Sequence, residues 1–132
     1  MVSTNRSIYI DANVLLEALL ERKRQATAEA YLLSHAADRL YISALTGHLV
    51  THFGGEFHQL SVLKQFLADY TILPLETIDF EWAFTNIRNN DFEDALQLAV
   101  AIHHGCNIFM TLDQPLYKAY RDLASIQVEM LR

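Results

Sequence analysis

Short apolar runs alternate with helical patterns along the whole sequence, and this alternation limits the possible folds more than any other feature. The strand-like runs are residues 7–10, 40–42, 71–73, 107–110 and 126–129. The helical patterns are residues 13–24, 26–37, 45–53, 56–70, 78–88, 92–104 and 116–122. Because strands that alternate with helices form βαβ units, we predict an α/β fold with a parallel sheet that helices cover on both faces.

The length and composition indicate one ordered domain. At 132 residues the chain has the length of a single domain, which we expect to span residues 1–132. Apolar residues make up 52% of the chain and can supply a core. The charged fraction of 20% is too low for a disordered segment.

Three features favour a cytoplasmic protein that makes no membrane contact. No apolar run is long enough to span a bilayer. The N-terminal segment has Asp11 where the apolar region of a signal peptide would lie. The single cysteine, Cys106, excludes an intramolecular disulfide and fits a reducing cytosol. Because no basic neighbour in the sequence would lower its pKa, we interpret Cys106 as a core residue rather than a nucleophile.

The net charge of -6 argues against broad, non-specific binding of nucleic acid, which usually needs a basic surface. Part of the acidic excess could instead be metal ligands, whose charge a bound ion offsets. The densest basic run is Arg22, Lys23 and Arg24, which we interpret as a solvated helix end.

Three aspartates are predicted at one edge of the sheet. In such folds the C-terminal ends of the strands and the N-terminal ends of the following helices share an edge, where ligands bind. Asp11 ends the first strand and Asp113 ends the fourth. Asp94 lies in the first turn of the helix that follows Asp91.

Each aspartate also has a simpler explanation, because Asp11, Asp91 and Asp113 could cap the helices that follow them. The combination favours a metal site. Asp94 shares a helical stripe with Leu98, and a carboxylate on that stripe is costly to bury unless it is paired or metal-bound. Clustered carboxylates repel one another unless a cation lies between them. Oxygen ligands of this kind suit Mg²⁺ or Mn²⁺, as one ion or two.

Four segments, in this order and spacing, resemble the PIN-domain family and within it the VapC-type toxins of bacterial and archaeal toxin–antitoxin pairs. They read YIDAN at 9–13, YIS at 41–43, DFEDALQ at 91–97 and TLD at 111–113. The resemblance covers nearly the whole chain. It implies a PIN-like three-layer sandwich with a five-stranded parallel sheet, metal-dependent endoribonuclease activity, homodimerisation and inhibition by a small protein antitoxin.

The resemblance also implies roles for single residues. Asp11, Asp94 and Asp113 would be the catalytic, metal-binding acids, with Asp91 in a supporting role. Two further residues, Asn13 and Thr111, would orient the acids or a water by hydrogen bonds. A third, Ser43, would lie beside them at the end of the second strand.

The sequence departs from the family pattern at one acidic position. The family usually carries a glutamate about five residues after the serine, where this chain has His48. Histidine supplies no negative charge and suits Mg²⁺ poorly. Glu93 could substitute, although it points about 100° away from its neighbour Asp94 on the helix. His48 and His52 are also spaced as a zinc pair, but we favour two partly buried or helix-surface histidines.

The remaining polar and aromatic residues of interest have structural interpretations. We expect His103 and His104 to interact with the dipole at the C-terminal end of their helix. No base-stacking motif surrounds four aromatic residues that we assign to the core or to a dimer contact, namely Tyr70, Phe80, Trp82 and Phe84.

Three functions remain open from the sequence. The first is a metal-dependent ribonuclease acting as a toxin. The second is a catalytically weakened PIN fold that binds protein or RNA, which His48 favours. The third is a phosphate-transfer enzyme with Asp11 as nucleophile. This last function would need a second aspartate where Asn13 stands and a lysine that grips phosphate.

Overall fold

The computed structural model describes residues 6–132, so residues 1–5 of the N-terminal segment lie outside it. Its strands are β1 (Ser7–Ile10), β2 (Arg39–Ser43), β3 (Thr71–Leu73), β4 (Ile108–Thr111) and β5 (Gln127–Met130). Its helices are α1 (Ala12–Leu19), α2 (Gln25–Ser34), α3 (Ala44–Gly54), α4 (Leu60–Leu67), α5 (Thr77–Asn86), α6 (Phe92–His103) and α7 (Gln114–Tyr120). The predicted order and type of every element are confirmed within the described residues.

The five strands form one parallel sheet in the order β3-β2-β1-β4-β5. The chain builds outward from β1 to β2 and β3, and then returns to the other side of β1 to add β4 and β5. The strand order therefore reverses between β1 and β4, and in open α/β sheets ligands bind at such a point, beyond the carboxyl ends of the strands.

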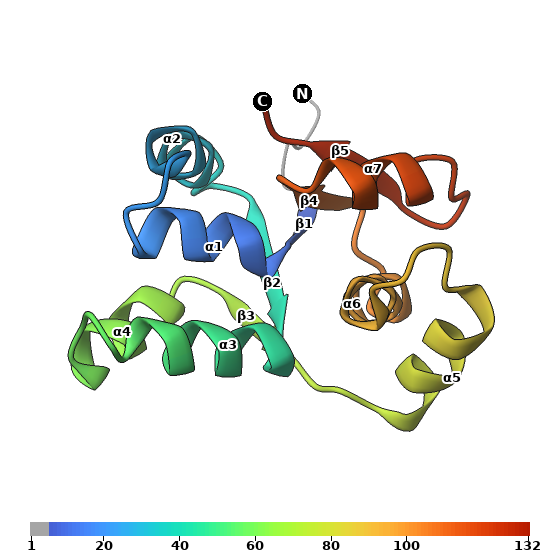
Figure 1. Ribbon diagram of the computed structural model, residues 1–132, viewed down its shortest axis with the longest axis horizontal. Helices are drawn as coiled ribbons and strands as arrows, with labels where there is room; N and C mark the ends of the chain where they lie inside the picture. The colour runs from blue at the N-terminus through green and yellow to red at the C-terminus, as the bar shows by residue number, and fades with distance from the viewer. Residues whose placement is uncertain (1–5) are drawn as a thin grey trace.

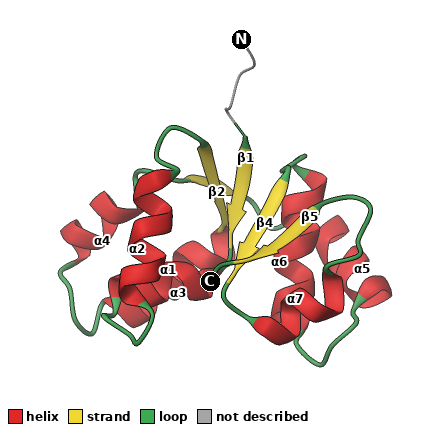
Figure 2. Ribbon diagram, turned by 90° about the horizontal axis from the view of Figure 1, so that it is seen from above, coloured by secondary structure: helices red, strands yellow, loops and turns green. Residues whose placement is uncertain are grey.

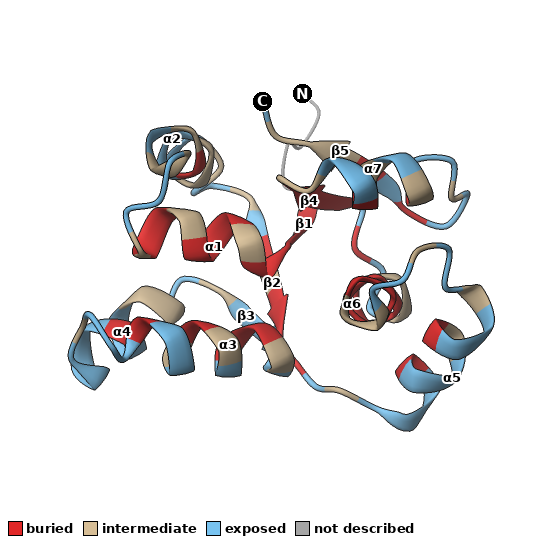
Figure 3. Cartoon of the chain, viewed as in Figure 1, coloured by how far each residue is buried: buried red, intermediate tan, exposed pale blue. Residues whose placement is uncertain are grey.

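Helices cover both faces of the sheet, which makes the predicted three-layer architecture correct. Figures 1 and 2 show α1 to α4 on one side and α5 to α7 on the other. Side chains alternate along β1, so Ile8 and Ile10 enter the core under α1, whereas Tyr9 enters the core under α6 and α7. Burial is concentrated in the central strands and in α6 (Figure 3).

Helices α1 and α4 are shorter than predicted by four residues or more. α1 ends at Leu19 because the chain turns at Glu21, which has a positive φ of 52°. The Glu17 carboxylate then accepts a hydrogen bond from the Arg24 backbone N–H at 3.0 Å, and Arg24 precedes α2. The basic run therefore lies in a turn between helices. α4 begins only at Leu60, which is exposed.

No helix within residues 6–132 combines the length and the apolar character needed to cross a membrane.

The glycines of α3 allow a test of the packing between α1, α3 and α4. A Cβ at Gly54 would lie 2.7 Å from Leu63 Cδ2 and 2.8 Å from Leu19 Cδ2, and both leucines are buried. We predict that Gly54→Ala lowers the free energy of unfolding by about 1 kcal/mol or more, because a Cβ this close forces the packed Leu63 side chain to shift. Urea denaturation measures this change.

Gly47→Ala is the matched control on the same helix. Its added Cβ would make only an ordinary contact of 3.8 Å with Ile72. Removing a helical glycine then raises the free energy of unfolding by up to about 1 kcal/mol. Equal shifts of the urea midpoint for the two variants would contradict tight packing at Gly54.

Candidate functional site

Asp11 lies at the end of β1, where the strand order reverses, and only 3% of its surface is exposed. The side chain of Gln97 donates from Nε2 to Asp11 Oδ1 at 3.1 Å. The Thr111 hydroxyl donates to Asp11 Oδ2 at 2.7 Å. Although Asp11 occupies the N-cap position of α1, its side chain makes no capping hydrogen bond. The capping explanation is therefore wrong for Asp11.

Thr111 and Asn13 connect Asp11 to the loop that follows β4. The Thr111 hydroxyl accepts from the Asp113 backbone N–H at 2.9 Å and from Asn13 Nδ2 at 3.5 Å. The side-chain oxygen Oδ1 of Asn13 accepts from the Leu112 backbone N–H at 3.2 Å. The ends of β1 and β4 are thus joined by side-chain hydrogen bonds beyond the last strand pairing.

Asp94 is buried in the first turn of α6, and its Oδ2 accepts from Asn89 Nδ2 at 3.0 Å. Asp91 is exposed and caps α6 by accepting from the Asp94 N–H. Asp113 caps α7 through Oδ1, which accepts from the Leu116 N–H at 3.1 Å. Capping therefore does explain one oxygen of Asp91 and of Asp113.

The acids share one electrostatic environment. Burial is the main cause that raises the pKa of Asp11 from 3.8 to about 6, and the Asp113 charge adds to it. The pKa of Asp94 rises from 3.8 to about 7, first through burial and then through the charges of Asp11, Asp91 and Asp113. A cation beside Asp11 and Asp94 would offset this repulsion.

Sequence analysis missed two polar residues at the centre of the site. Gln97 is 1% exposed and contacts Asp11, while Asn89 holds Asp94. Gln97 gave a usable signal, because an amide among Leu96, Leu98 and other apolar residues of a buried helix needs hydrogen-bond partners. Asn89 gave none, since it lies in a loop.

The structure does not bring His48 to the acids. His48 is exposed on α3, where its ring stacks on that of His52 with centroids 5.9 Å apart. The α3 side chain that reaches the site is Thr46, which donates to Gln97 and lies two positions before His48, about 200° away around the helix. Ser43 is buried but caps α3 by accepting from the Thr46 N–H, and no acid accepts from it within residues 6–132.

Other predicted features have structural roles. His103 is paired with the buried Asp79 of α5 at 2.5 Å, so its partner is a carboxylate rather than the helix end alone. His104 lies 3.8 Å from Glu76. Cys106 is buried, and burial raises the pKa of its thiol to about 11, as expected of a core residue.

The aromatic residues divide between the core and the surface. Tyr70 and Trp82 pack against the two main cores. Phe80 and Phe84 are exposed on α5, where their rings lie beside that of Phe92. The assignment of Phe80 and Phe84 to the core is therefore wrong.

The carboxylate oxygens of the site suit a hard divalent cation, with two acids rather than three placed to hold it. Asp94 Oδ1 and Asp113 Oδ2 accept no hydrogen bond within residues 6–132, so both can face a ligand. In the same part of the chain, no group of three or more histidine, cysteine, aspartate or glutamate side chains is placed to hold one ion. Mg²⁺ is commonly bound by one or two carboxylates together with water and substrate phosphates.

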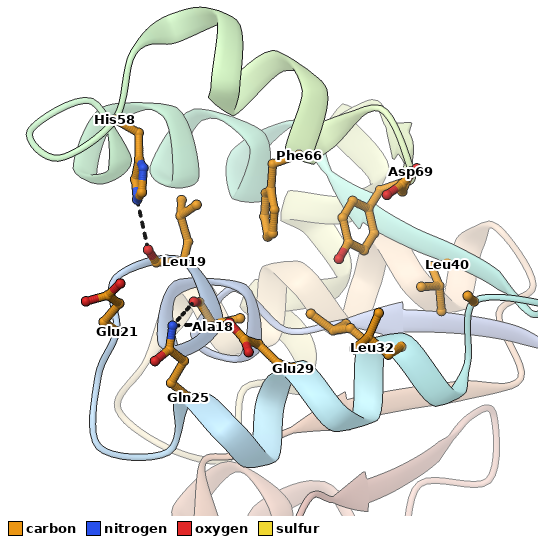
Figure 4. Close-up of a pocket in the computed structure, with 13 residues that line it drawn as sticks. Ala18, Leu19, Glu21, Gln25, Glu29, Leu32, Leu40, His58, Phe66 and Asp69 are labelled. Carbon is orange, nitrogen blue, oxygen red and sulfur yellow. Dashed lines mark hydrogen bonds between the residues drawn. The ribbon is translucent and has the colours of Figure 1, made fainter.

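A separate hollow of ≈ 610 Å³ lies between α1, α2 and α4 and includes none of the three aspartates. Figure 4 shows apolar side chains such as Leu19, Leu32 and Phe66 pointing into it. Its carboxylates are Glu21, Glu29 and Asp69, and none of its lining residues is lysine or arginine. We call it the α1–α2–α4 groove.

Comparison with known proteins identifies the family. The PIN domain model matches residues 8–122, so this chain belongs to the PIN domain family. No curated protein matches the sequence.

Solved structures share the fold at low identity. A toxin–antitoxin complex from Klebsiella pneumoniae contains a chain with 21% identity and a TM-score of 0.71, over 91% of this chain and 95% of that one. VapBC2 from Rickettsia felis, bound to a DNA fragment from its promoter, gives 14% identity and a TM-score of 0.67, over 95% and 99%. DNA-bound VapBC from Salmonella typhimurium gives 12% identity and a TM-score of 0.68, over 96% of this chain and 99% of that one.

The raised pKa values predict an unusual pH dependence of stability. Because Asp11 and Asp94 have higher pKa values in the folded chain than the ordinary 3.8, the folded state binds protons more tightly than the unfolded state. Their contribution to stability is greatest below about pH 4 and is lost as the pH rises through about 6 and 7. We expect Asp94→Asn to raise the unfolding free energy by ~2 kcal/mol at pH 8 in metal-free buffer, with little effect at pH 4.

Chemical denaturation of the unaltered chain and of Asp94→Asn across this pH range, with a chelator present, measures the difference in unfolding free energy. Glu81→Gln, on the exposed face of α5, is the control, and its unfolding free energy should differ from that of the unaltered chain by the same amount at every pH. A gain from Asp94→Asn that does not change with pH would contradict the charge repulsion.

Proposed function

We propose that this chain is a metal-dependent endoribonuclease and the toxin of a toxin–antitoxin pair. The observation that supports this function best is the burial of Asp11 and Asp94 at the point where the strand order reverses. Burial and the charges of neighbouring aspartates raise both pKa values there, an arrangement that destabilises the fold and is typical of a functional site. Membership of the PIN domain family and the shared fold of the toxin–antitoxin complexes agree with it.

In this proposal Asp11 and Asp94 hold one or two Mg²⁺ or Mn²⁺ ions, and Asp113 would add its free oxygen only after its side chain moves closer to them. A bound ion would supply positive charge to an RNA phosphodiester and make a water more acidic. Thr111 and Gln97 keep the Asp11 carboxylate in place, and Asn89 does the same for Asp94. Asp94, whose pKa burial raises to about 7, would bind such an ion in its deprotonated form.

Asp94→Asn tests this function. We predict that the variant folds, binds Mn²⁺ at least about tenfold more weakly and loses cleavage of a mixed structured RNA, because one of two buried anions is removed. Calorimetric titration and gel analysis of the RNA are the measurements. Expression of the unaltered chain should arrest bacterial growth, and expression of Asp94→Asn should not.

Glu81→Gln should behave like the unaltered chain in all three assays. Unchanged Mn²⁺ affinity in Asp94→Asn would exclude the proposed site. Because His48 is exposed and points away from the acids, His48→Glu should not alter Mn²⁺ binding or cleavage.

A second function is supported by one observation. Within residues 6–132 no third acid joins Asp11 and Asp94 closely enough to form a complete ligand group, and α3 contributes only Thr46. A PIN fold weakened in this way would act by binding protein or RNA. Mn²⁺ binding without RNA cleavage and without growth arrest would favour this second function.

A small protein antitoxin is the proposed partner, and the α1–α2–α4 groove is its proposed binding surface. The similar solved structures are toxin–antitoxin complexes, two of them bound to DNA. The groove combines apolar walls with carboxylates and no lysine or arginine (Figure 4), which suits an apolar segment flanked by basic residues. We further propose a cytoplasmic homodimer, for which exposed Phe80 and Phe84 of α5 offer apolar surface.

Leu33→Arg tests the groove. Leu33 is 77% exposed on α2, so the change should not disturb folding. We predict that the variant still arrests growth but is no longer rescued by the small protein that rescues the unaltered chain. The introduced charge removes an apolar contact and repels a basic partner.

The rescuing protein is found by screening small proteins from the source genome for restored growth. Rescue of Leu33→Arg equal to that of the unaltered chain would place the partner elsewhere.

A further inference from the structure

Gln97 joins more parts of the site than any residue assigned to it from the sequence. Its side-chain oxygen Oε1 accepts three hydrogen bonds, from β1, from the start of α1 and from α3. The donors are the Tyr9 hydroxyl at 3.2 Å, the Ala12 backbone N–H at 3.3 Å and the Thr46 hydroxyl at 3.1 Å. The amide is therefore held between β1, the start of α1, and α3 as well as on α6.

These contacts fix which end of the amide faces Asp11. A backbone N–H can only donate, so the Ala12 N–H needs the carbonyl oxygen of Gln97 and excludes its NH₂ group from that position. The NH₂ group is consequently turned toward two carboxylates. Its nitrogen lies 3.1 Å from Asp11 Oδ1 and 3.4 Å from Glu93 Oε1.

The Asp11 carboxylate is held at both oxygens by this arrangement. Gln97 donates to Oδ1 from α6, and Thr111 donates to Oδ2 from β4. Two donors from different elements define the plane of the carboxylate and leave only its remaining lone pairs for a ligand. Removing a group that orients a metal ligand in this way commonly lowers metal affinity by roughly 10- to 100-fold.

We propose that Gln97 is a positioning residue of the candidate metal site, which fixes the Asp11 carboxylate in one orientation and ties Glu93 to it through the same nitrogen. The inference rests on the proposed function for its metal-binding part. Thr46 of α3 supplies one of the three hydrogen bonds that hold the Gln97 amide, and β1 and the start of α1 supply the other two.

Gln97→Met removes the donor to Asp11 while filling a similar volume. The expected results are an Asp11 side chain in a different rotamer in the metal-free crystal structure and Mn²⁺ affinity lowered about tenfold or more by calorimetry. Gln97→Asn is the second variant, in case the first does not fold. Its side chain is one methylene too short to reach both Thr46 and Asp11.

Thr46→Val is the matched control. It removes one buried hydrogen bond to the same amide but leaves the bond from Gln97 to Asp11. We expect a lower unfolding midpoint, as for the Gln97 variants, with the Asp11 rotamer and the Mn²⁺ affinity unchanged. Loss of stability alone in the Gln97 variants would show that the amide has only a structural role.

An unmoved Asp11 carboxylate in the metal-free crystals of the Gln97 variants overturns the proposal. If the unaltered chain binds no Mn²⁺, the proposed nuclease function fails. The Asp11 rotamer in the metal-free crystals still decides the role of Gln97, so the two failures are distinguishable.

Discussion

The polar contacts inside this fold are arranged around one carboxylate, that of Asp11, which is buried at the C-terminal end of the central strand β1. A buried charge without partners would be too costly, so the neighbouring residues must supply donors. Thr111 supplies one from β4 and Gln97 supplies the other from α6. The same two residues contact Asn13, Tyr9 and Thr46, so the buried charge organises polar contacts across five elements of an otherwise apolar interior.

The fold was predictable because its signals are local. Strand and helix periodicities can be read within a few residues, and their alternation leaves few topologies. The three aspartates were predictable as well, since each adjoins the end of a strand or the start of a helix at a common edge. Gln97 was missed because its partners are distant in sequence, and Asn89 was missed because it lies in a loop. His48 was misplaced because Ser43 caps α3 and sets its rotation, which spacing alone does not reveal.

The candidate site lowers the stability of the fold that carries it. Burial raises the pKa of Asp11 and of Asp94, and the charge of Asp11 raises that of Asp94 further. The rest of the chain compensates with two apolar cores on either side of the sheet and with polar side chains that are well satisfied. A bound cation, or a basic group of a partner, would stabilise the whole domain by neutralising these two acids.

Helix α6 has no solvent-facing side along most of its length, since every residue from Asp94 to Ala101 is buried. An ordinary surface helix can exchange half of its side chains with little effect, but α6 has contacts in every direction. Its polar members satisfy the carboxylate network and its apolar members fill two cores. Few substitutions there would be neutral, because each one loses contacts on one side of the helix or another.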